Sequence, residues 1–316
     1  MISTSEFSGQ VICMGGISMD LVMFMERLPL PGETLFTDNF AEIPGGKGGN
    51  QAHTAARMRA DTRFFGKVGH DSYGDRLVRS MLDAGVNVDN VGRDDHAGSG
   101  ITMVFVEASG QNAICFAPGA NKRLTPYEVQ ANAKLFGPGD ILLITMELDG
   151  ATVYAAIETA KAAGAFVILD PAPARKDIPA HIPGLVDIVK PNEMEAGIIT
   201  GVQVADVGTA SLAAERLAAI GFKLPIVTLG GKGSIAWLDG TARHIKPLPV
   251  SSIDTTAAGD VFNGSLAAAL SRNEGIEYAL EFASVASALS TTVRGAQPSI
   301  PDYDTVVEAM SAEVRP

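Results

Sequence analysis

The sequence contains only two cysteines, Cys13 and Cys115, which are too few for a disulfide framework. They are typical of free thiols in a reducing compartment, so we expect a cytoplasmic protein. Apolar runs such as 140–145 are far shorter than the roughly 20 residues that a membrane span requires. The beginning of the chain lacks the basic stretch and apolar core of a secretory signal. Neither a membrane partner nor secretion is expected.

Basic residues are also scarce. The 24 Lys and Arg residues are outnumbered by 36 Asp and Glu residues, which gives a formal net charge of −12. This balance disfavours a broad electrostatic contact with nucleic acid or anionic membranes. The histidines form no pair at helical spacing and the cysteines lie far apart, so the sequence predicts neither a zinc site nor a Cys–His nucleophile.

Two common nucleotide-binding motifs are missing. No segment fits the P-loop pattern, because the Gly-Lys pair at 231–232 is followed by Gly233. Residues 231–236 match the spacing of a dinucleotide motif, but a β-like run at 234–238 follows where a helix is required. These absences exclude P-loop kinases and disfavour nicotinamide-dependent dehydrogenases.

What is present is a regular alternation of short apolar strands and amphipathic helices. A length of 316 residues favours two domains, or one large α/β domain with an appendage. Near-continuous apolar strands separated by helices predict a parallel sheet covered on both faces, with ligands at the carboxyl ends of the strands. We expect strands at 11–15, 62–68, 140–145, 166–170, 186–190 and 225–229, and helices at 50–60, 72–84, 151–163, 193–200 and 209–220.

Two segments interrupt this alternation. Residues 21–43 and 100–118 each hold two β-like runs without a helix between them. We interpret them as one small antiparallel sheet, a lid separate from a main domain of residues 1–20, 44–99 and 119–316; edge strands of the main sheet are the alternative. Exposed edges and apolar residues such as Phe105 and Val106 predict that the lid also pairs with a second copy, giving a homodimer.

The first glycine-rich segment covers residues 44–52 and leads directly into a helix. Four glycines allow close backbone approach, and free amides with a positive dipole end point toward whatever binds there. Lys47 adds a cation and Asn50 a side-chain amide. A plain flexible turn is the alternative interpretation.

The second segment, residues 254–260, places small residues before an apolar helix, where consecutive amides can bind an anion. Asp260 lies in the first turn, and Asp254 lies six residues earlier. Asp260 as a simple helix cap is the alternative. Asp254 is a second carboxylate beside the same anion pocket, which a simple cap does not explain. We therefore favour the interpretation that Asp260 is a base, which accepts a proton from a nucleophile attacking the anion.

Together these segments resemble the two signatures of the PfkB (ribokinase-like) carbohydrate kinases, and among them ribokinase most closely. The resemblance covers nearly the whole chain and implies a three-layer αβα fold with a mainly parallel central sheet and a small antiparallel β lid. Ala257 stands where many members have Gly, which we interpret as a subfamily difference. Further segments match in order and spacing: 15–20, 31–33, 69–74, 171–174, 191–195, 228–233 and 295–299.

The resemblance implies roles for the residues around the transferred phosphoryl group. Asp260 would be the catalytic base, and a helix start would favour its ionised form. The amides of Ala257, Ala258 and Gly259 would form the anion hole. Asn192 and Glu195 would position phosphate, water and Mg²⁺, with a helix cap as the alternative. Thr228, Gly230 and Gly233 would form the ATP loop, with a tight turn as the alternative.

The resemblance also implies a sugar site and a cation site. Glu147 as a helix-start acid is an alternative, and Ser18 stands where ribokinases usually have Asn. A K⁺ ion would neutralise Asp254, unless this residue caps a turn or pairs with Arg294. The sugar contacts would be Ser18, Asp20, Gly46, Lys47, Asn50, Glu147 and Asp260, and the K⁺ site would be Asp254, Thr256, Ser290, Val293, Gly295 and Ser299.

The function implied is an ATP-dependent sugar kinase that acts on the primary hydroxyl of a pentose, with D-ribose giving ribose 5-phosphate. A kinase for another sugar, such as 2-deoxyribose or a ketohexose, or for a nucleoside, is the first alternative. A non-catalytic sugar-binding regulator is the second, and the intact Asp260, Asn192 and Glu195 disfavour it.

Overall fold

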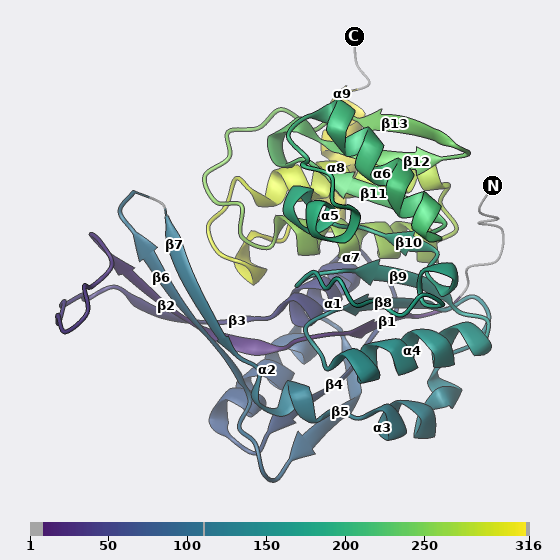
Figure 1. The fold of residues 1–316 in the computed structure, drawn as a ribbon. Coiled ribbons are helices and arrows are strands. Elements are labelled where there is room, and N and C mark those ends of the chain that lie inside the picture. The colour runs from purple at the N-terminus through teal and green to yellow at the C-terminus, as the bar shows by residue number, and fades with distance from the viewer. Residues whose placement is uncertain (1–8, 110, 314–316) are drawn as a thin grey trace.

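A nine-stranded sheet forms the centre of the computed structural model, which describes residues 9–109 and 111–313 (Figure 1). The strand order is β13-β12-β11-β10-β9-β8-β1-β4-β5. Neighbours from β11 to β5 are parallel, and β12 and β13 are antiparallel. The strands are β1 (Val11–Met14), β4 (Thr62–Gly69), β5 (Asn87–Asp94), β8 (Ile141–Thr145), β9 (Phe166–Asp170), β10 (Ile188–Val189), β11 (Leu224–Thr228), β12 (Ser234–Leu238) and β13 (Thr241–Ile245).

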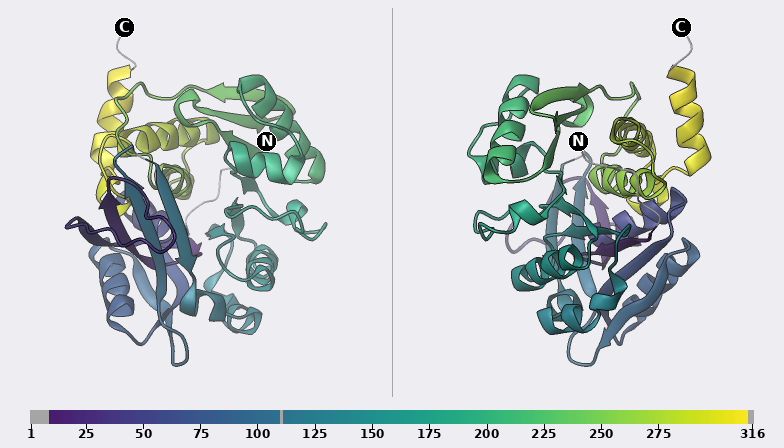
Figure 2. Two further views of the ribbon diagram at one scale, coloured as in Figure 1. Left: turned by 60° about the vertical axis from the view of Figure 1, so that its left-hand side comes forward. Right: turned by 90° about the vertical axis from the view of Figure 1, so that its right-hand side faces the viewer.

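Helices cover both faces of this sheet (Figure 2). In β1, Val11 and Cys13 belong to one apolar core, whereas Ile12 and Met14 belong to the other, because successive strand side chains point to opposite faces. The predicted three-layer αβα architecture is therefore confirmed. The first core contains α1 (Lys47–Arg57), α2 (Ser72–Asp83), α7 (Ala258–Ser271), α8 (Ile276–Ser290) and α9 (Tyr303–Glu313); the second contains α3 (Pro126–Ala131), α4 (Gly150–Ala162), α5 (Glu193–Thr200) and α6 (Val207–Ile220).

A second sheet of four strands, in the order β3-β2-β6-β7, projects from the main body (Figure 1). It consists of β2 (Ser18–Met25), β3 (Phe40–Gly45), β6 (Gly100–Glu107) and β7 (Asn112–Ala117). The prediction of a separate small sheet is confirmed, and the alternative of edge strands on the main sheet is wrong.

The small sheet is mixed, so the expectation of an antiparallel lid is wrong for its central pair. β2 and β6 run parallel, with Ser18 opposite Gly100 and Met25 opposite Glu107. Both strands leave the main domain side by side and run outward, which makes them parallel. Only the outer pairs, β2 with β3 and β6 with β7, are antiparallel.

The first glycine-rich segment runs from the end of β3 into α1. The predicted helix 50–60 begins earlier, at Lys47, because Gly46 has a φ of 84° and starts the helix. A Cβ at Gly48 would lie 2.6 Å from the Cα of Gly15, so a side chain is excluded where α1 packs against the end of β1. Among the described residues, no helix is long and apolar enough to cross a membrane.

Candidate active site

Polar side chains gather where the parallel strands of the main sheet end. A cleft of about 640 Å³ opens there, between the ends of β9, β10 and β11 and the start of α7. Its lining includes Lys47, Asn192, Glu195, Thr228, Gly230, Gly233, Ala257, Ala258, Gly259 and Asp260. A larger hollow of about 870 Å³ between α1 and α2 contains none of the predicted site residues. The structure therefore brings residues from both glycine-rich segments to one cleft.

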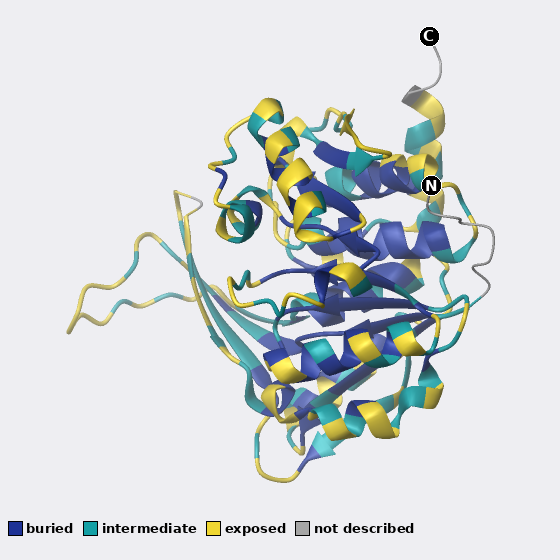
Figure 3. Cartoon of the chain, turned by 45° about the vertical axis from the view of Figure 1, so that its right-hand side comes forward, coloured by how far each residue is buried: buried dark blue, intermediate teal, exposed yellow. Residues whose placement is uncertain are grey.

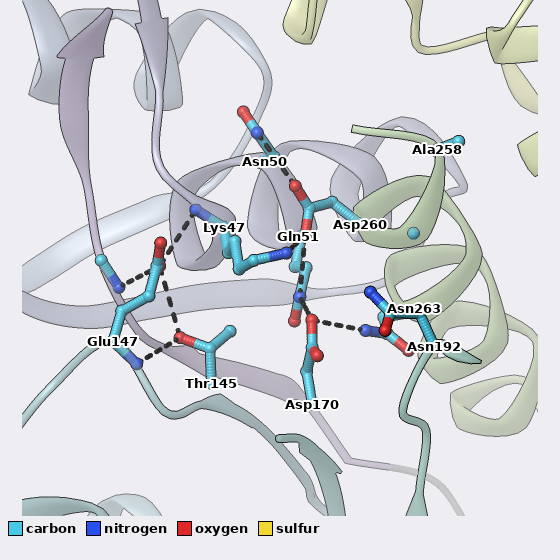
Figure 4. Close-up of polar contacts among 12 residues, drawn as sticks. Lys47, Asn50, Gln51, Thr145, Glu147, Asp170, Asn192, Ala258, Asp260 and Asn263 are labelled. Carbon is cyan, nitrogen blue, oxygen red and sulfur yellow. Dashed lines mark hydrogen bonds and ion pairs between the residues drawn. The ribbon is translucent and has the colours of Figure 1, made fainter. Parts of the chain in front are cut away.

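Asp260 lies in the first turn of α7 and is buried (Figure 4). Asn50 Nδ2 and Gln51 Nε2 each donate to one of its carboxylate oxygens, at 3.1 Å. Lys47 Nζ lies 3.9 Å from Asp260 Oδ1. This arrangement fixes the carboxylate plane between α1 and α7.

The expectation that the helix start favours ionised Asp260 needs correction. Burial raises the pKa of Asp260, and the nearby Asp170 adds to this rise. Lys47 and the amides of Asn50 and Gln51 lower the pKa, but they do not compensate fully. Desolvation therefore gives a carboxylate that accepts a proton more readily than an exposed one.

The predicted anion hole begins at Ala257, which is left-handed with a φ of 60°. One of its three predicted donors, the amide of Ala258, donates to the carbonyl of Thr255 at 3.2 Å. Ser287 Oγ donates to the carbonyl of Ala258 at 2.8 Å, and Lys190 Nζ donates to that of Gly259 at 3.3 Å. These bonds connect the start of α7 to α8 and to the end of β10.

Glu147 lies just beyond the end of β8. Its Oε2 accepts from the amides of Gly16, at 3.0 Å, and Lys47, at 3.1 Å (Figure 4). Glu147 therefore contacts the first residue of α1 and is not an acid in the first turn of α4, the helix that follows it in the sequence. A Cβ at Gly16 would lie 2.5 Å from this oxygen, which explains the glycine. Burial raises the pKa of Glu147 to about 7, although Lys47 opposes the rise.

Ser18 and Asp20 lie at the base of β2, beside α1. Ser18 Oγ is within 3.1 Å of Asp20 Oδ1 and 2.9 Å of Thr102 Oγ1 on β6. A Cβ at Gly45 would lie 2.2 Å from Asp20 Oδ2, so glycine makes room for this carboxylate. Burial raises the pKa of Asp20 despite the hydroxyl donors.

Asn192 and Glu195 form a capping box at the start of α5. Asn192 Oδ1 accepts from the Glu195 amide, and Glu195 Oε2 accepts from the Asn192 amide, both at 2.9 Å. Both residues also line the cleft. Their capping of α5 is therefore compatible with a place in the site. Burial raises the pKa of Glu195, and Asp170 contributes.

Gly230 and Gly233 lie in the turn that joins β11 to β12, after Thr228. Their φ values are +51° and +86°, and a Cβ at Gly233 would lie 2.1 Å from the Ile245 carbonyl oxygen. The tight-turn alternative is therefore correct for the backbone. Because Thr228 and both glycines line the cleft, the turn is also part of its wall.

Asp254 connects the two loops predicted to hold a cation. Its Oδ1 accepts from the Thr256 amide at 2.9 Å, and its Oδ2 from the Gly295 amide at 2.8 Å. Burial would raise the pKa of Asp254, but these amides and nearby Arg294 lower it. Asp254 therefore caps the turn at Thr256, as the alternative interpretation expects, and it also joins the two loops that were predicted to lie together.

The remaining residues of the predicted cation site lie at the end of α8 and beyond. The hydroxyl of Ser290 donates to Ser287 O at 2.8 Å, and that of Ser299 to Ala296 O at 2.7 Å. Val293 is exposed. In the described ranges, no three His, Cys, Asp or Glu side chains are grouped closely enough to hold a metal ion.

Sequence reasoning missed four polar residues of the site: Gln51, Asp170, Lys190 and Asn263. Gln51 and Asn263 follow recognised motif residues by one and three positions. Asp170 is the last residue of β9, and Lys190 follows the last residue of β10. Both strands were predicted, so the rule that ligands lie at the carboxyl ends of parallel strands could have identified these two residues.

The fold and this cleft define a class of protein, the kinases that transfer a phosphoryl group to a carbohydrate hydroxyl. Residues 8–303 match the model of the pfkB family carbohydrate kinases. The chain belongs to this family. It is a phosphotransferase with an alcohol group as acceptor.

Similar proteins include ribokinases and deoxyribokinases. The chain is 37% identical over 295 residues to a ribokinase from Haemophilus influenzae, covering 93% of this chain and 96% of that one. It is 32% identical over 301 residues to a deoxyribokinase from Salmonella typhi, covering 95% and 98%. A crystal structure of ribokinase from Thermotoga maritima superposes with a TM-score of 0.86 at 33% identity, covering 96% and 99%. The structure of an Arabidopsis thaliana ribokinase complexed with ribose and ATP superposes with a TM-score of 0.86 at 29% sequence identity, covering 96% of this chain and 99% of that one.

Proposed function

We propose that the protein transfers the γ-phosphoryl group of ATP to the primary hydroxyl of D-ribose, giving ribose 5-phosphate. The observation that carries this proposal is the placement of Asp260. Its buried carboxylate lies between two amide donors of α1 and faces Lys47. Ribokinases at 37% and 34% identity support ribose as the substrate.

The chemical step needs positioning and charge neutralisation more than covalent catalysis. Asp260 accepts the proton of the sugar hydroxyl while the oxygen of that hydroxyl forms a bond to the γ-phosphorus. The bond from that phosphorus to the β–γ bridging oxygen breaks, and ADP leaves with the electron pair. The start of α7 at Ala257–Gly259 stabilises the transferring group.

The nucleotide side of the cleft contains the Thr228–Gly233 turn and the capping box of Asn192 and Glu195. Mg²⁺ enters as part of the substrate MgATP. Because Mg²⁺ usually keeps its waters and takes few protein ligands, one carboxylate such as Glu195 suits it. K⁺ bound near Asp254 would balance the charge of this carboxylate beside the phosphate pocket.

A second candidate substrate is 2-deoxyribose. Ser18 already contacts Asp20 and Thr102, and a short hydroxyl side chain leaves room near the predicted sugar site. The deoxyribokinase relative adds weight to this candidate. We predict that Ser18→Asn raises the kcat/KM ratio of ribose to 2-deoxyribose several-fold, because a site built to bond one hydroxyl rejects an analogue without it. An unchanged ratio would remove Ser18 from that contact.

The experiment that tests the function is ADP release measured over ribose, 2-deoxyribose, fructose, tagatose and nucleosides. We expect ribose to give the highest kcat/KM. A preference for 2-deoxyribose would establish the second candidate, and a nucleoside or ketohexose preference would reject both pentoses.

We also propose a homodimer formed through the small sheet. Its outer strands β3 and β7 have free edges within the described chain, and Phe24, Phe40 and Ile114 are exposed on it. A second copy of the same sheet would cover both features.

A further inference from the structure

A second buried carboxylate lies behind Asp260. Asp170 is the last residue of β9, and only 1% of it is exposed. Its Oδ2 accepts from Gln51 Nε2 at 2.7 Å and from Asn263 Nδ2 at 3.0 Å (Figure 4). The proposed mechanism gives this group no role, although burying a charge is costly.

One amide nitrogen joins the two carboxylates. Gln51 Nε2 donates to Asp170 Oδ2 and also, at 3.1 Å, to Asp260 Oδ1. Because an amide nitrogen carries two hydrogens, it can bond both acceptors at once. The two acceptors therefore fix the orientation of the Gln51 amide, and this amide fixes one side of the Asp260 carboxylate.

We propose that Asp170 is a positioning residue of the reaction: through Gln51 it holds Asp260 in place, and its negative charge favours proton uptake by Asp260. This inference rests on the proposed role of Asp260 as the base. Asp170 itself touches neither sugar nor phosphate in this account.

Several other charges face Asp260, so the contribution of Asp170 must be separated from theirs. Lys47 on α1 opposes proton uptake by Asp260, whereas Asp170 favours it. The charges of Asp20 on β2 and Glu147 after β8 interact with that of Asp260. Glu195 on α5 interacts with Asp170, and Lys190 after β10 bonds the Gly259 carbonyl. Of these groups, Asp170 alone shares a hydrogen-bond donor with Asp260 in the described residues.

The test is the pH profile of kcat at saturating MgATP and ribose. Asp170→Asn keeps an acceptor oxygen for Gln51 and Asn263 but removes the charge. We expect the acid limb to move to lower pH by about one unit, as loss of a nearby like charge predicts, with the ribose KM unchanged within about twofold. Asp149→Asn, the same substitution at an exposed carboxylate, should leave the limb where it is.

Gln51→Met removes the shared donor while keeping a side chain of similar length. We expect kcat to fall by about tenfold or more, since small displacements of a catalytic group are costly, again with little change in the ribose KM. This variant decides the positioning role even if Asp170→Asn fails to fold.

Three results would overturn the proposal: an acid limb unmoved in Asp170→Asn, a limb that vanishes in Glu147→Gln, or a normal kcat in Gln51→Met. A changed MgATP requirement with an unmoved limb would assign Asp170 to the nucleotide instead. If Asp260→Asn retains turnover, the proposed function fails first; if Asp260→Asn is inactive and the limb stays unmoved, only this inference fails.

Discussion

The ends of the main-sheet strands and the small sheet differ in how they expose their side chains (Figure 3). At the strand ends, buried polar groups bond one another, as Gln51 does with Asp170 and Asp260. On the small sheet most residues are half-buried or exposed, and Phe40 and Ile114 are 51% and 62% exposed. We call the ends of the main-sheet strands, with the polar groups bonded there, the fixed region. We infer that the fixed region performs the chemistry, and that the small sheet covers the sugar and contacts a second subunit.

The largest effect is expected at the fixed region. Asp260→Asn should lower kcat by roughly 10²–10⁴-fold, because an amide cannot accept the hydroxyl proton. Sugar binding, measured by calorimetry, should remain largely intact. The matched control is Asp83→Asn on the exposed end of α2, which should keep full turnover. Near-normal kcat in Asp260→Asn would remove this residue from the base role.

A smaller effect is expected at the predicted K⁺ site near Asp254. Replacing K⁺ by tetramethylammonium at constant chloride should reduce turnover several-fold at saturating MgATP and sugar. Asp254→Asn should abolish the K⁺ dependence, because the charge that holds the ion is lost. Equal rates in the two salts would refute activation by K⁺.

On the small sheet, a charge at the edge strand should affect assembly before chemistry. Ile114→Lys places a cation on β7, and we expect light scattering to show a monomer where the unchanged protein is a dimer. Ile220→Lys, at an exposed isoleucine that ends α6, is the control and should leave the dimer intact. A monomeric unchanged protein at micromolar concentration would defeat the dimer proposal.

The smallest effect concerns Glu147, where the two regions meet. Its pKa rises from 4.5 to about 7 on folding because burial disfavours the charged form. Between these values the folded protein keeps a proton that the unfolded chain has released. The stabilising contribution is therefore complete below pH 4.5 and is lost as the pH rises through about 7.

Glu147→Gln cannot titrate, so it isolates this contribution. The Tm of the unchanged protein minus that of the variant should fall by a few degrees between pH 5 and pH 8. A difference that stays constant over this range would show that the carboxyl group titrates normally.

The fold was largely predictable because apolar strands and amphipathic helices alternate along the main domain. The parallel pairing of β2 with β6 was not, since it joins segments that local patterning treats as separate hairpins. In the site, Asp260 was singled out by the small residues that precede an apolar helix, whereas Asn192 and Glu195 were found through the family resemblance. Gln51 and Asp170 were missed because their importance comes from burial and a shared hydrogen-bond donor, which exist only after the chain has folded.

Transfer to the primary hydroxyl of ribose is tested by determining the structure of the product. The protein would be incubated with MgATP and D-ribose, with Asp260→Asn in parallel, and followed by ³¹P NMR with proton coupling. We predict a new phosphate ester coupled to the two C5 protons, formed in step with ADP and absent in Asp260→Asn. Inorganic phosphate alone, or an ester at C1, would contradict transfer to the primary hydroxyl.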